Sequence, residues 1–285
     1  MSNSNQFDAI VIGSGLGGLT VAAILSKLNH KKVLILEQHY VVGGYTHEFA
    51  RESKFKWDVG LHYVGNMGKG ELGRKIFDYL TNGNLKWNKM PDPFEKFVYP
   101  DFTFEQSCDP IKFKEELISK FPQEKPGIEQ YFWDITNLAQ TIKVPDLLSI
   151  LMKLFGPRLR KIERLTTKEY LDRNFQDPKL KALLAFAYFD ASDRGAIYGI
   201  PYVPERLGKK WLRAKTPIKH LYLTGMDVVC SGIMPALIGG IKTAGVINGK
   251  FGFYKIMSTI FKESARPDDR LKAHLKDLNS PVLKI

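Results

Sequence analysis

The chain has 285 residues, a length that predicts about two domains at roughly 150 residues each. With 44% hydrophobic and 25% charged residues, the composition excludes the disordered, collagen-like and disulfide-scaffold classes. Two cysteines, Cys108 and Cys230, are too few for a disulfide framework or a cysteine-based metal site. The net charge of +12 favours anionic partners such as lipid headgroups, nucleic acid or phosphorylated ligands.

The sequence shows no targeting or membrane-spanning segment. Residues 1–6 are polar, and the apolar run at residues 9–12 is too short for the core of a signal peptide. Nowhere do about 18 apolar residues follow one another without a charge. We therefore expect a cytoplasmic chain, either fully soluble or in peripheral contact with a membrane.

The clearest pattern lies near the N-terminus. Residues 8–12 and 32–36 are apolar and rich in β-branched side chains, which predicts two strands buried on both faces. Between them, small and apolar residues recur at helical spacing from Leu19 onward. The first strand runs into a glycine-rich turn that reads Gly13-Ser14-Gly15-Leu16-Gly17-Gly18.

Each part of this pattern suits a bound dinucleotide. Gly13 permits a tight turn, Gly15 lets the backbone approach a pyrophosphate, and Gly18 lets the helix pack on the strand. The helix N-terminus presents its unpaired N–H groups to the phosphates. Glu37, at the end of the second strand, is placed to accept hydrogen bonds from a ribose 2′-OH. A strand–turn–helix without a ligand is the alternative, and the complete pattern disfavours it.

A second glycine pair, Gly43 and Gly44, follows Glu37 and Gln38 and is not part of the plain NAD fingerprint. With it, the sequence resembles the flavoprotein dehydrogenases of the phytoene desaturase type, and among them the carotenoid isomerases and retinol saturases most closely. Residues 55–65 resemble the family block that leads toward the isoalloxazine ring, and residues 219–229 resemble its C-terminal flavin motif. The resemblance is strong over about residues 7–65 and 195–250.

The resemblance implies one FAD site built from both ends of the chain. Asp227 would hydrogen-bond the ribityl chain or the adjoining phosphate. The helix that begins near Ile233 would point its positive end at the flavin ring, where it stabilises the charge of reduced flavin. The residues expected to bind FAD are Gly13, Ser14, Gly15, Gly17, Gly18, Glu37, Gln38, Gly43, Gly44, Gly60, Gly225, Asp227 and Ile233.

The function implied by the resemblance is FAD-dependent oxidoreduction at C=C bonds of a polyene, retinoid or carotenoid-like lipid, of the saturase, desaturase or isomerase type. His62 and Tyr63 are the candidate catalytic residues, because they can move protons and lie in the flavin-facing block. A structural role for both is the alternative. No second dinucleotide fingerprint occurs, so the sequence indicates no electron donor.

The predicted fold is α/β, a Rossmann-like FAD-binding domain made of residues 1–65 and 195–285 around a mostly helical substrate or cap region at 66–194. A third strand is expected at 219–223 and a weak fourth at 196–198. The stretch between residues 190 and 219 is interrupted by glycines and prolines and is too short for another right-handed crossover. We interpret this as an internal deletion relative to the family. A truncated, catalytically inactive relative that binds nucleotide, lipid or a full-length partner is therefore the second hypothesis.

Within the inserted region, residues 94–104 alternate as in a hairpin, and helices are expected at 109–121 and 127–141. The hairpin aromatics suit either a cap over an apolar ligand or ordinary core packing. The sequence has no His pair spaced as metal ligands, no G-x-S-x-G hydrolase motif and no nucleic-acid-binding signature. We therefore expect neither a metal nor a nucleic-acid partner.

Two segments combine an apolar face with basic residues, as an interfacial membrane helix requires. One covers residues 144–159, with a basic cluster that continues to Arg164. A core helix with a solvated charged side is the alternative for each segment. The second lies in the tail and contains Phe251, Phe253, Ile256, Met257, Ile260 and Phe261 with Lys255 and Lys262.

Overall fold

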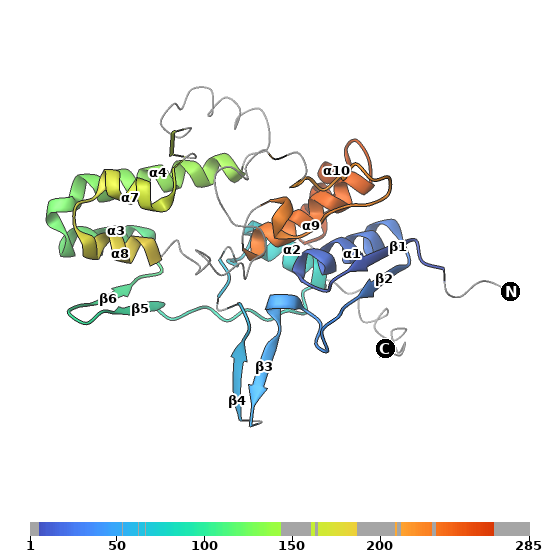
Figure 1. The fold of residues 1–285 in the computed structure, drawn as a ribbon, viewed down its shortest axis with the longest axis horizontal. Coiled ribbons are helices and arrows are strands. Elements are labelled where there is room, and N and C mark those ends of the chain that lie inside the picture. Colours follow the sequence, from blue (N-terminus) through green and yellow to red (C-terminus); the bar gives the residue numbers. More distant parts are fainter. Residues whose placement is uncertain are drawn as a thin grey trace. The chain divides into compact units, whose positions relative to one another are not determined.

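In a computed structural model the chain forms two compact units (Figure 1). Unit 1 contains Met1–Trp87 and Gly208–Ile285, and unit 2 contains Asn88–Leu207. Unit 1 therefore joins the N-terminal and C-terminal segments of the chain. The structure describes residues 6–52, 54–61, 63–65, 67–143, 161–162, 165–186, 209, 212–229 and 232–264.

Unit 1 opens with the predicted strand–helix–strand, but the prediction that the strands are buried on both faces is wrong, because Ile10 and Ile12 are 60% and 85% exposed. Strand β1 (Ala9–Ile12) leads into helix α1 (Leu16–Asn29), which is followed by strand β2 (Val33–Leu36). The two strands pair in parallel, with Ile10 opposite Leu34. Parallel strands joined by a helix form the unit from which Rossmann-like folds are built. The predicted α/β fold class is confirmed.

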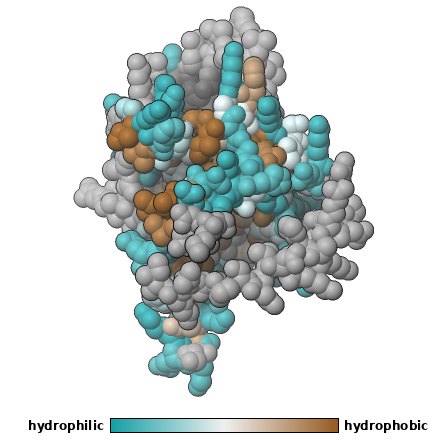
Figure 2. Space-filling model, turned by 90° about the vertical axis from the view of Figure 1, so that its right-hand side faces the viewer, coloured by the Kyte–Doolittle hydropathy of each residue, from teal (hydrophilic) through white to brown (hydrophobic). Residues whose placement is uncertain are grey.

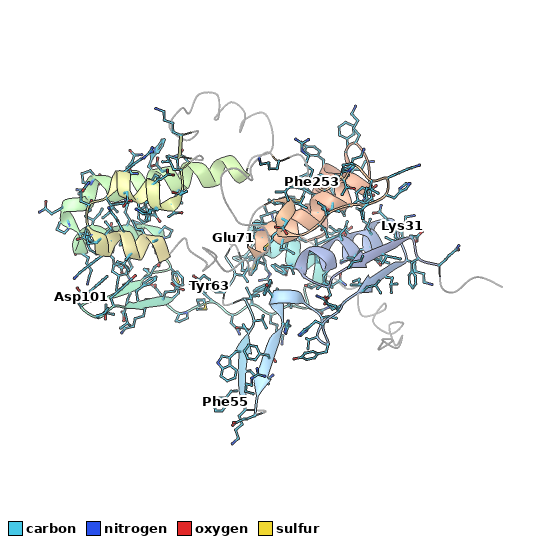
Figure 3. The ribbon with its side chains drawn as sticks, viewed as in Figure 1. Lys31, Phe55, Tyr63, Glu71, Asp101 and Phe253 are labelled. Carbon is cyan, nitrogen blue, oxygen red and sulfur yellow. The ribbon has the colours of Figure 1, made fainter. Side chains whose placement is uncertain are left out.

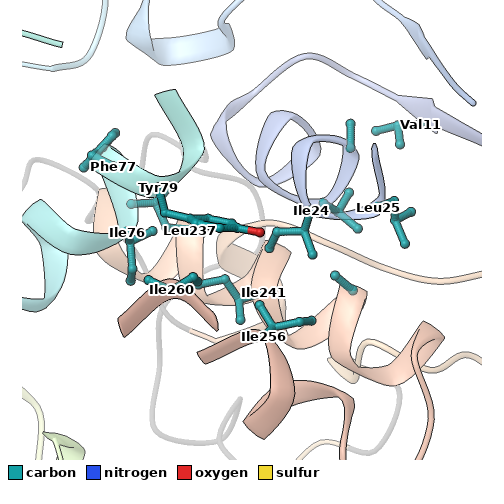
Figure 4. Packing of buried hydrophobic residues seen from close by; sticks show 13 residues of the cluster. Val11, Ile24, Leu25, Ile76, Phe77, Tyr79, Leu237, Ile241, Ile256 and Ile260 are labelled. Carbon is teal, nitrogen blue, oxygen red and sulfur yellow. The ribbon is translucent and has the colours of Figure 1, made fainter. Parts of the chain in front are cut away.

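The core of unit 1 is formed by four helices. Helix α9 (Ile233–Ile247) packs against α1, α10 (Gly252–Glu263) folds back on α9, and α2 (Leu72–Thr81) packs against α1 and α10. Figure 4 shows their side chains meeting, and six of the aliphatic ones are fully buried or nearly so. The six are Ile24, Ile76, Leu237, Ile241, Ile256 and Ile260.

The boundary of unit 1 differs from the one drawn at residue 65 in the sequence analysis. Helix α2 contributes Ile76, Phe77 and Tyr79 to the core shared with α1, α9 and α10. This burial draws the chain up to Trp87 into unit 1. From the sequence alone these residues fall in the helical insertion, because the resemblance weakens after residue 65.

The predicted third strand at 219–223 is wrong. Tyr222 makes an isolated antiparallel bridge with Lys215, and the Leu223 N–H donates to the Ala214 carbonyl at 2.9 Å. The segment thus pairs with the residues just before it, which uses hydrogen-bonding groups that a strand beside β1 would need. Residues 196–198 and the proposed deletion near residue 190 lie outside the described residues.

A β-hairpin that the sequence analysis did not predict follows the second glycine pair. Its strands are β3 (Glu48–Arg51) and β4 (Phe55–Asp58), which pair antiparallel with Phe49 opposite Trp57. The hairpin extends away from the helices of unit 1, and Figure 3 shows Phe55 near its far end. Phe55 and Trp57 remain 54% and 47% exposed.

Unit 2 confirms the predicted hairpin and both predicted helices. Strands β5 (Glu95–Val98) and β6 (Thr103–Gln106) pair antiparallel, followed by α3 (Pro110–Lys120) and α4 (Lys125–Lys143). The Asp109 side chain caps α3 by accepting the Ile111 N–H at 2.8 Å. Two further helices, α7 (Thr167–Asn174) and α8 (Pro178–Phe186), complete the described part of the unit.

The hairpin aromatics of unit 2 belong to its own core. Phe97 and Phe104 are buried beside Leu117, Ile128 and Phe175. This is what the core-packing alternative predicts for these side chains. The other two hairpin aromatics, Tyr99 and Phe102, are partly buried against the same core.

The tail helix is likewise largely a core helix. Ile256 and Ile260 are fully buried against the other helices of unit 1, as the core alternative predicts. Residues 144–159, the other segment with an expected membrane-facing side, lie outside the described residues. Among the residues that are described, no helix has the length and apolar character needed to cross a bilayer.

Candidate dinucleotide-binding site

The glycine turn after β1 leaves a helix N-terminus open. Gly13 has a φ of +93°, which favours glycine, and its N–H donates to the Leu36 carbonyl at 2.7 Å. Gly15 is the N-cap of α1, where no side chain caps the helix. The first amides of α1 are thus available for an anion, as a phosphate-binding turn requires. A Cβ on Gly18 would lie 2.2 Å from the Gly13 carbonyl oxygen and 3.2 Å from Val11 Cγ1 of β1, so α1 packs on the turn and on the strand before it.

Neither the backbone angles nor the contacts within the protein require a glycine at position 15. Its backbone angles, φ −61° and ψ 167°, are accessible to any residue. A Cβ on Gly15 would meet no protein atom within 4 Å. The space beside this residue therefore fits the close approach of a pyrophosphate, which is the reason for a glycine at this place in dinucleotide-binding turns.

Glu37 and Ser14 tie the turn to β2. One carboxylate oxygen of Glu37 accepts the N–H and the hydroxyl of Ser14 at 2.7 and 2.6 Å, and the other accepts the His39 N–H at 2.9 Å. The Ser14 hydroxyl, followed by the His39 amide, lowers the pKa of Glu37 to about 2. Glu37 is thus a fixed negative charge with remaining lone pairs. Its predicted bond to a ribose stays a prediction.

The second glycine pair packs against the first turn. The Gly43 N–H donates to the hydroxyl oxygen of the fully buried Ser14 at 3.0 Å. A Cβ on Gly44 would lie 2.9 Å from the Gly15 Cα. Gly60 approaches the same loop, because a Cβ there would lie 3.1 Å from the Tyr45 Cβ. Ser14 therefore links both glycine turns, whereas the neighbouring Gln38 is exposed.

The C-terminal segment meets the glycine turn through backbone contacts. A Cβ on Gly17 would lie 2.4 Å from the Gly225 Cα, and one on Gly239 of α9 would lie 2.0 Å from the Gly225 carbonyl oxygen. The Thr243 hydroxyl donates to the Leu223 carbonyl at 2.7 Å and fixes the approach to this contact. The two ends of the chain thus form one region, as the sequence analysis expected.

Asp227 and the start of α9 lie beside this contact. Asp227 is half-buried in a 3₁₀ turn, Met226–Val228, that packs against α9. Helix α9 begins at the partly buried Ile233 after Gly232, which provides no side-chain cap. The N-terminus of α9 therefore offers a positive partial charge next to the Gly225 turn. The flavin contacts predicted for Asp227 and Ile233 stay predictions.

The two candidate catalytic residues are not brought into a defined arrangement. His62 lies outside the described residues. Tyr63, labelled in Figure 3, follows β4 in an irregular segment and is 48% exposed. In the part of the chain that the structure describes, no three His, Cys, Asp or Glu side chains are grouped so that they could hold a metal ion.

The glycine pair inside α9 makes a contribution that was not predicted from the sequence. A Cβ on Gly240 would lie 2.6 Å from the Thr20 Cβ of α1, and Gly239 contacts Gly225 as described above. Glycine within a helix costs about 1 kcal/mol relative to alanine, so a pair in an otherwise apolar helix signals a close packing contact. Without these residues α1 and α9 would be held apart.

Comparison with known proteins supports this interpretation. The family described as NAD(P)-binding Rossmann-like domain matches residues 11–80. All-trans-retinol 13,14-reductase of Rattus norvegicus is 34% identical over 197 residues, which is 64% of this chain and 32% of that protein. Prolycopene isomerase 1, chloroplastic, of an Oncidium hybrid cultivar is 32% identical over 213 residues, 70% of this chain and 36% of the isomerase.

A third relative, named inactive all-trans-retinol 13,14-reductase, from Danio rerio, is 32% identical over 134 residues, which is 45% of this chain and 22% of that protein. The chain thus spans about a third or less of the length of these curated relatives. The glycine turn and the second glycine pair both lie within the residues that the Rossmann-like family matches. Over 64–70% of its own length, the chain is thus similar to members of the retinol saturase and carotenoid isomerase family.

Proposed function

We propose that this chain binds FAD and acts as an FAD-dependent oxidoreductase on C=C bonds of a retinoid or carotenoid-like polyene. The observation that carries the proposal is the open space at Gly15, between an uncapped helix N-terminus and the fixed carboxylate of Glu37. The relatives named as a retinol reductase and a prolycopene isomerase support the substrate class.

The residues of unit 1 divide the binding of FAD between them. The N-terminus of α1 and the turn around Gly15 would hold the pyrophosphate. Glu37 has lone pairs left to accept a ribose hydroxyl, and Asp227 would take the ribityl chain. When bound, FAD supplies hydride transfer to or from a substrate carbon. The positive end of α9 would stabilise negative charge on the reduced ring.

Proton transfer would then fall to the segment after β4. The Tyr63 side chain is exposed and follows the strand, and its hydroxyl is a proton donor of the kind that general acid catalysis uses. His62, its neighbour in the sequence, is the second candidate. Their proposed role is to deliver or remove the proton that accompanies hydride transfer.

A shortened, inactive relative that binds nucleotide, lipid or a full-length partner is the second candidate function, and two observations favour it. The chain covers about a third or less of its relatives, one of which is named inactive. FAD binding without turnover would be the result.

The test is the flavin content and redox response of the purified chain. The first candidate predicts a yellow protein whose visible absorption bleaches on anaerobic reduction and reoxidises in the presence of a polyene. Colourless protein whose melting temperature does not rise with added FAD refutes cofactor binding. Yellow protein that reduces but turns over no polyene supports the second candidate.

A paired substitution tests where the cofactor lies. Glu37→Ala with Asp227→Ala is expected to lower the flavin content of the purified protein. The matched control is Glu105→Ala with Glu115→Ala, two exposed carboxylates of unit 2, which should leave the flavin content unchanged. Equal flavin content in both double variants would show that the cofactor is not bound where we place it.

A further inference from the structure

Helix α10 presents a second, outward face that its core contacts do not use. Phe251 at its N-cap is 60% exposed, and Tyr254 and Phe261 are 49% and 45% exposed. These three aromatics are distinct from Ile256 and Ile260, which point into the core of unit 1. We define the α10 face as the exposed residues Phe251, Tyr254, Lys255, Ser258, Phe261 and Lys262.

The α10 face is basic as well as aromatic. The Lys250 ammonium lies 5.7 Å from the centre of the Phe251 ring, and the Lys75 ammonium of α2 lies 4.7 Å from that of Phe261. Lys255 and Lys262, spaced seven positions apart, lie on the same side of the helix. Glu263 is the one acidic residue of α10. Two of the three exposed aromatic rings are thus accompanied by a cation.

An open groove of about 620 Å³ adjoins this face. It lies among the C-terminal end of α1, the turn between α9 and α10, and α10 itself. Its polar lining includes Asn29, Asn248, Lys255, Ser258, Thr259 and Lys262. The Asn29 and Asn248 amides and the Thr259 hydroxyl donate to acceptors within the protein. The groups that the groove offers to phosphate oxygens are therefore the ammonium groups of Lys255 and Lys262, together with the Ser258 hydroxyl.

We propose that the α10 face binds the surface of an anionic phospholipid membrane. The lipid phosphates would be bound by Lys255 and Lys262 in the groove, and the aromatics would enter the boundary between headgroups and acyl chains. Aromatic side chains with lysines at their edges are typical of segments at that boundary. Figure 2 shows a face of the molecule on which apolar residues in brown lie among hydrophilic residues in teal.

Charge distinguishes a membrane from a protein partner. The buried centre of a protein interface is depleted of lysine, whereas lysines adjoin the exposed rings of this face. The net charge of +12 adds a long-range attraction to an anionic surface. The inference goes beyond the proposed function, because it depends on neither FAD nor a polyene.

The experiment is co-sedimentation of the full chain with vesicles of phosphatidylcholine alone or of phosphatidylcholine with phosphatidylserine. We expect binding to the anionic vesicles that weakens as salt rises. Lys255→Gln with Lys262→Gln should weaken it about 30-fold, since each basic residue contributes about a five- to sixfold gain near such a surface. Wild-type binding that is equal for both vesicle types, or unchanged in this variant, would overturn the proposal.

The aromatic contribution has a matched control in the same unit. Phe251→Ser with Tyr254→Ser should weaken vesicle binding, whereas Phe55→Ser with Trp57→Ser on the β3–β4 hairpin should not, although those rings are equally exposed. Circular dichroism checks that each variant folds. Loss of binding in the hairpin variant alone would overturn the assignment to α10. A vesicle-free dimer that the Phe251/Tyr254 variant abolishes would identify the face as a protein interface instead.

Discussion

Gly15→Ala and Gly17→Ala each add one methyl group to the glycine turn. The two variants are expected to have opposite effects on the free energy of unfolding of the cofactor-free protein. The Gly15 backbone suits alanine, and nothing in the protein lies within 4 Å of the added Cβ. Gly15→Ala should therefore stabilise the fold by about 0.4–1 kcal/mol, because the unfolded chain loses freedom. A Cβ at Gly17 would lie 2.4 and 2.7 Å from the Cα and N of Gly225. Gly17→Ala should destabilise by about 1–3 kcal/mol or more, because backbone atoms at both sides resist displacement.

The two variants should also differ in their affinity for FAD. In Gly15→Ala the methyl group occupies the space that we assign to the pyrophosphate, so FAD affinity should fall. An overlap worth about 1–3 kcal/mol corresponds to a roughly five- to 150-fold weaker Kd. Gly17→Ala, by contrast, should show lower thermal stability without FAD, by roughly 2–4 °C for each kcal/mol lost.

The assay is thermal unfolding of both variants and the wild type with and without FAD, together with FAD titration. The reasoning predicts that Gly15→Ala melts at or above the wild type without FAD and gains less from added FAD. If Gly15→Ala binds FAD as tightly as the wild type, the space beside the turn is not the pyrophosphate site. If Gly17→Ala melts like the wild type, the close packing of α1 on Gly225 is incorrect.

Three further predictions concern single side chains. The pKa of Glu37 is lowered from 4.5 to about 2 in the folded protein, so its contribution to stability is full above about pH 4.5 and is lost as the pH falls toward 2. In denaturant unfolding across this pH range, Glu37→Gln should therefore lose less unfolding free energy on acidification than the wild type. Thr166→Ala removes the capping box that Thr166 and Glu169 form at α7 and should destabilise unit 2 by about 1 kcal/mol, and an equal urea midpoint would contradict this. Tyr63→Phe should keep the flavin content and slow polyene turnover, and unchanged turnover would exclude the Tyr63 hydroxyl as the proton donor.

Elements fixed by local signals could be predicted from the sequence. The β1–α1–β2 unit follows from two apolar β-branched runs around a glycine turn, and the start of α3 follows from Asp109 and the proline after it. The β5–β6 hairpin follows from alternation between turn residues. In each case the determining residues lie within one or two turns of the element.

The rest depends on contacts between distant residues, which periodicity does not reveal. The approach of Gly17 to Gly225, and of Gly240 to the Gly17 carbonyl, brings together backbones more than 200 positions apart. Residues 219–223 have the pattern of a strand, but Tyr222 pairs with Lys215. To form a third strand, this segment would have to pair with the edge of β1. Its backbone groups instead form hydrogen bonds with the residues just before it.

The β1–β2 sheet itself shows how the cofactor turn can persist in a chain this short. Helix α1 covers the side of β1 on which Val11 is buried, whereas Ile10 and Ile12 remain 60% and 85% exposed. In a full doubly wound fold both faces of such strands are covered. The contacts of the turn, from Ser14 to Glu37 and from Gly17 to Gly225, involve no residue of that uncovered face. Binding of the dinucleotide and enclosure of a substrate are therefore separable, and flavin content and polyene turnover must be measured independently.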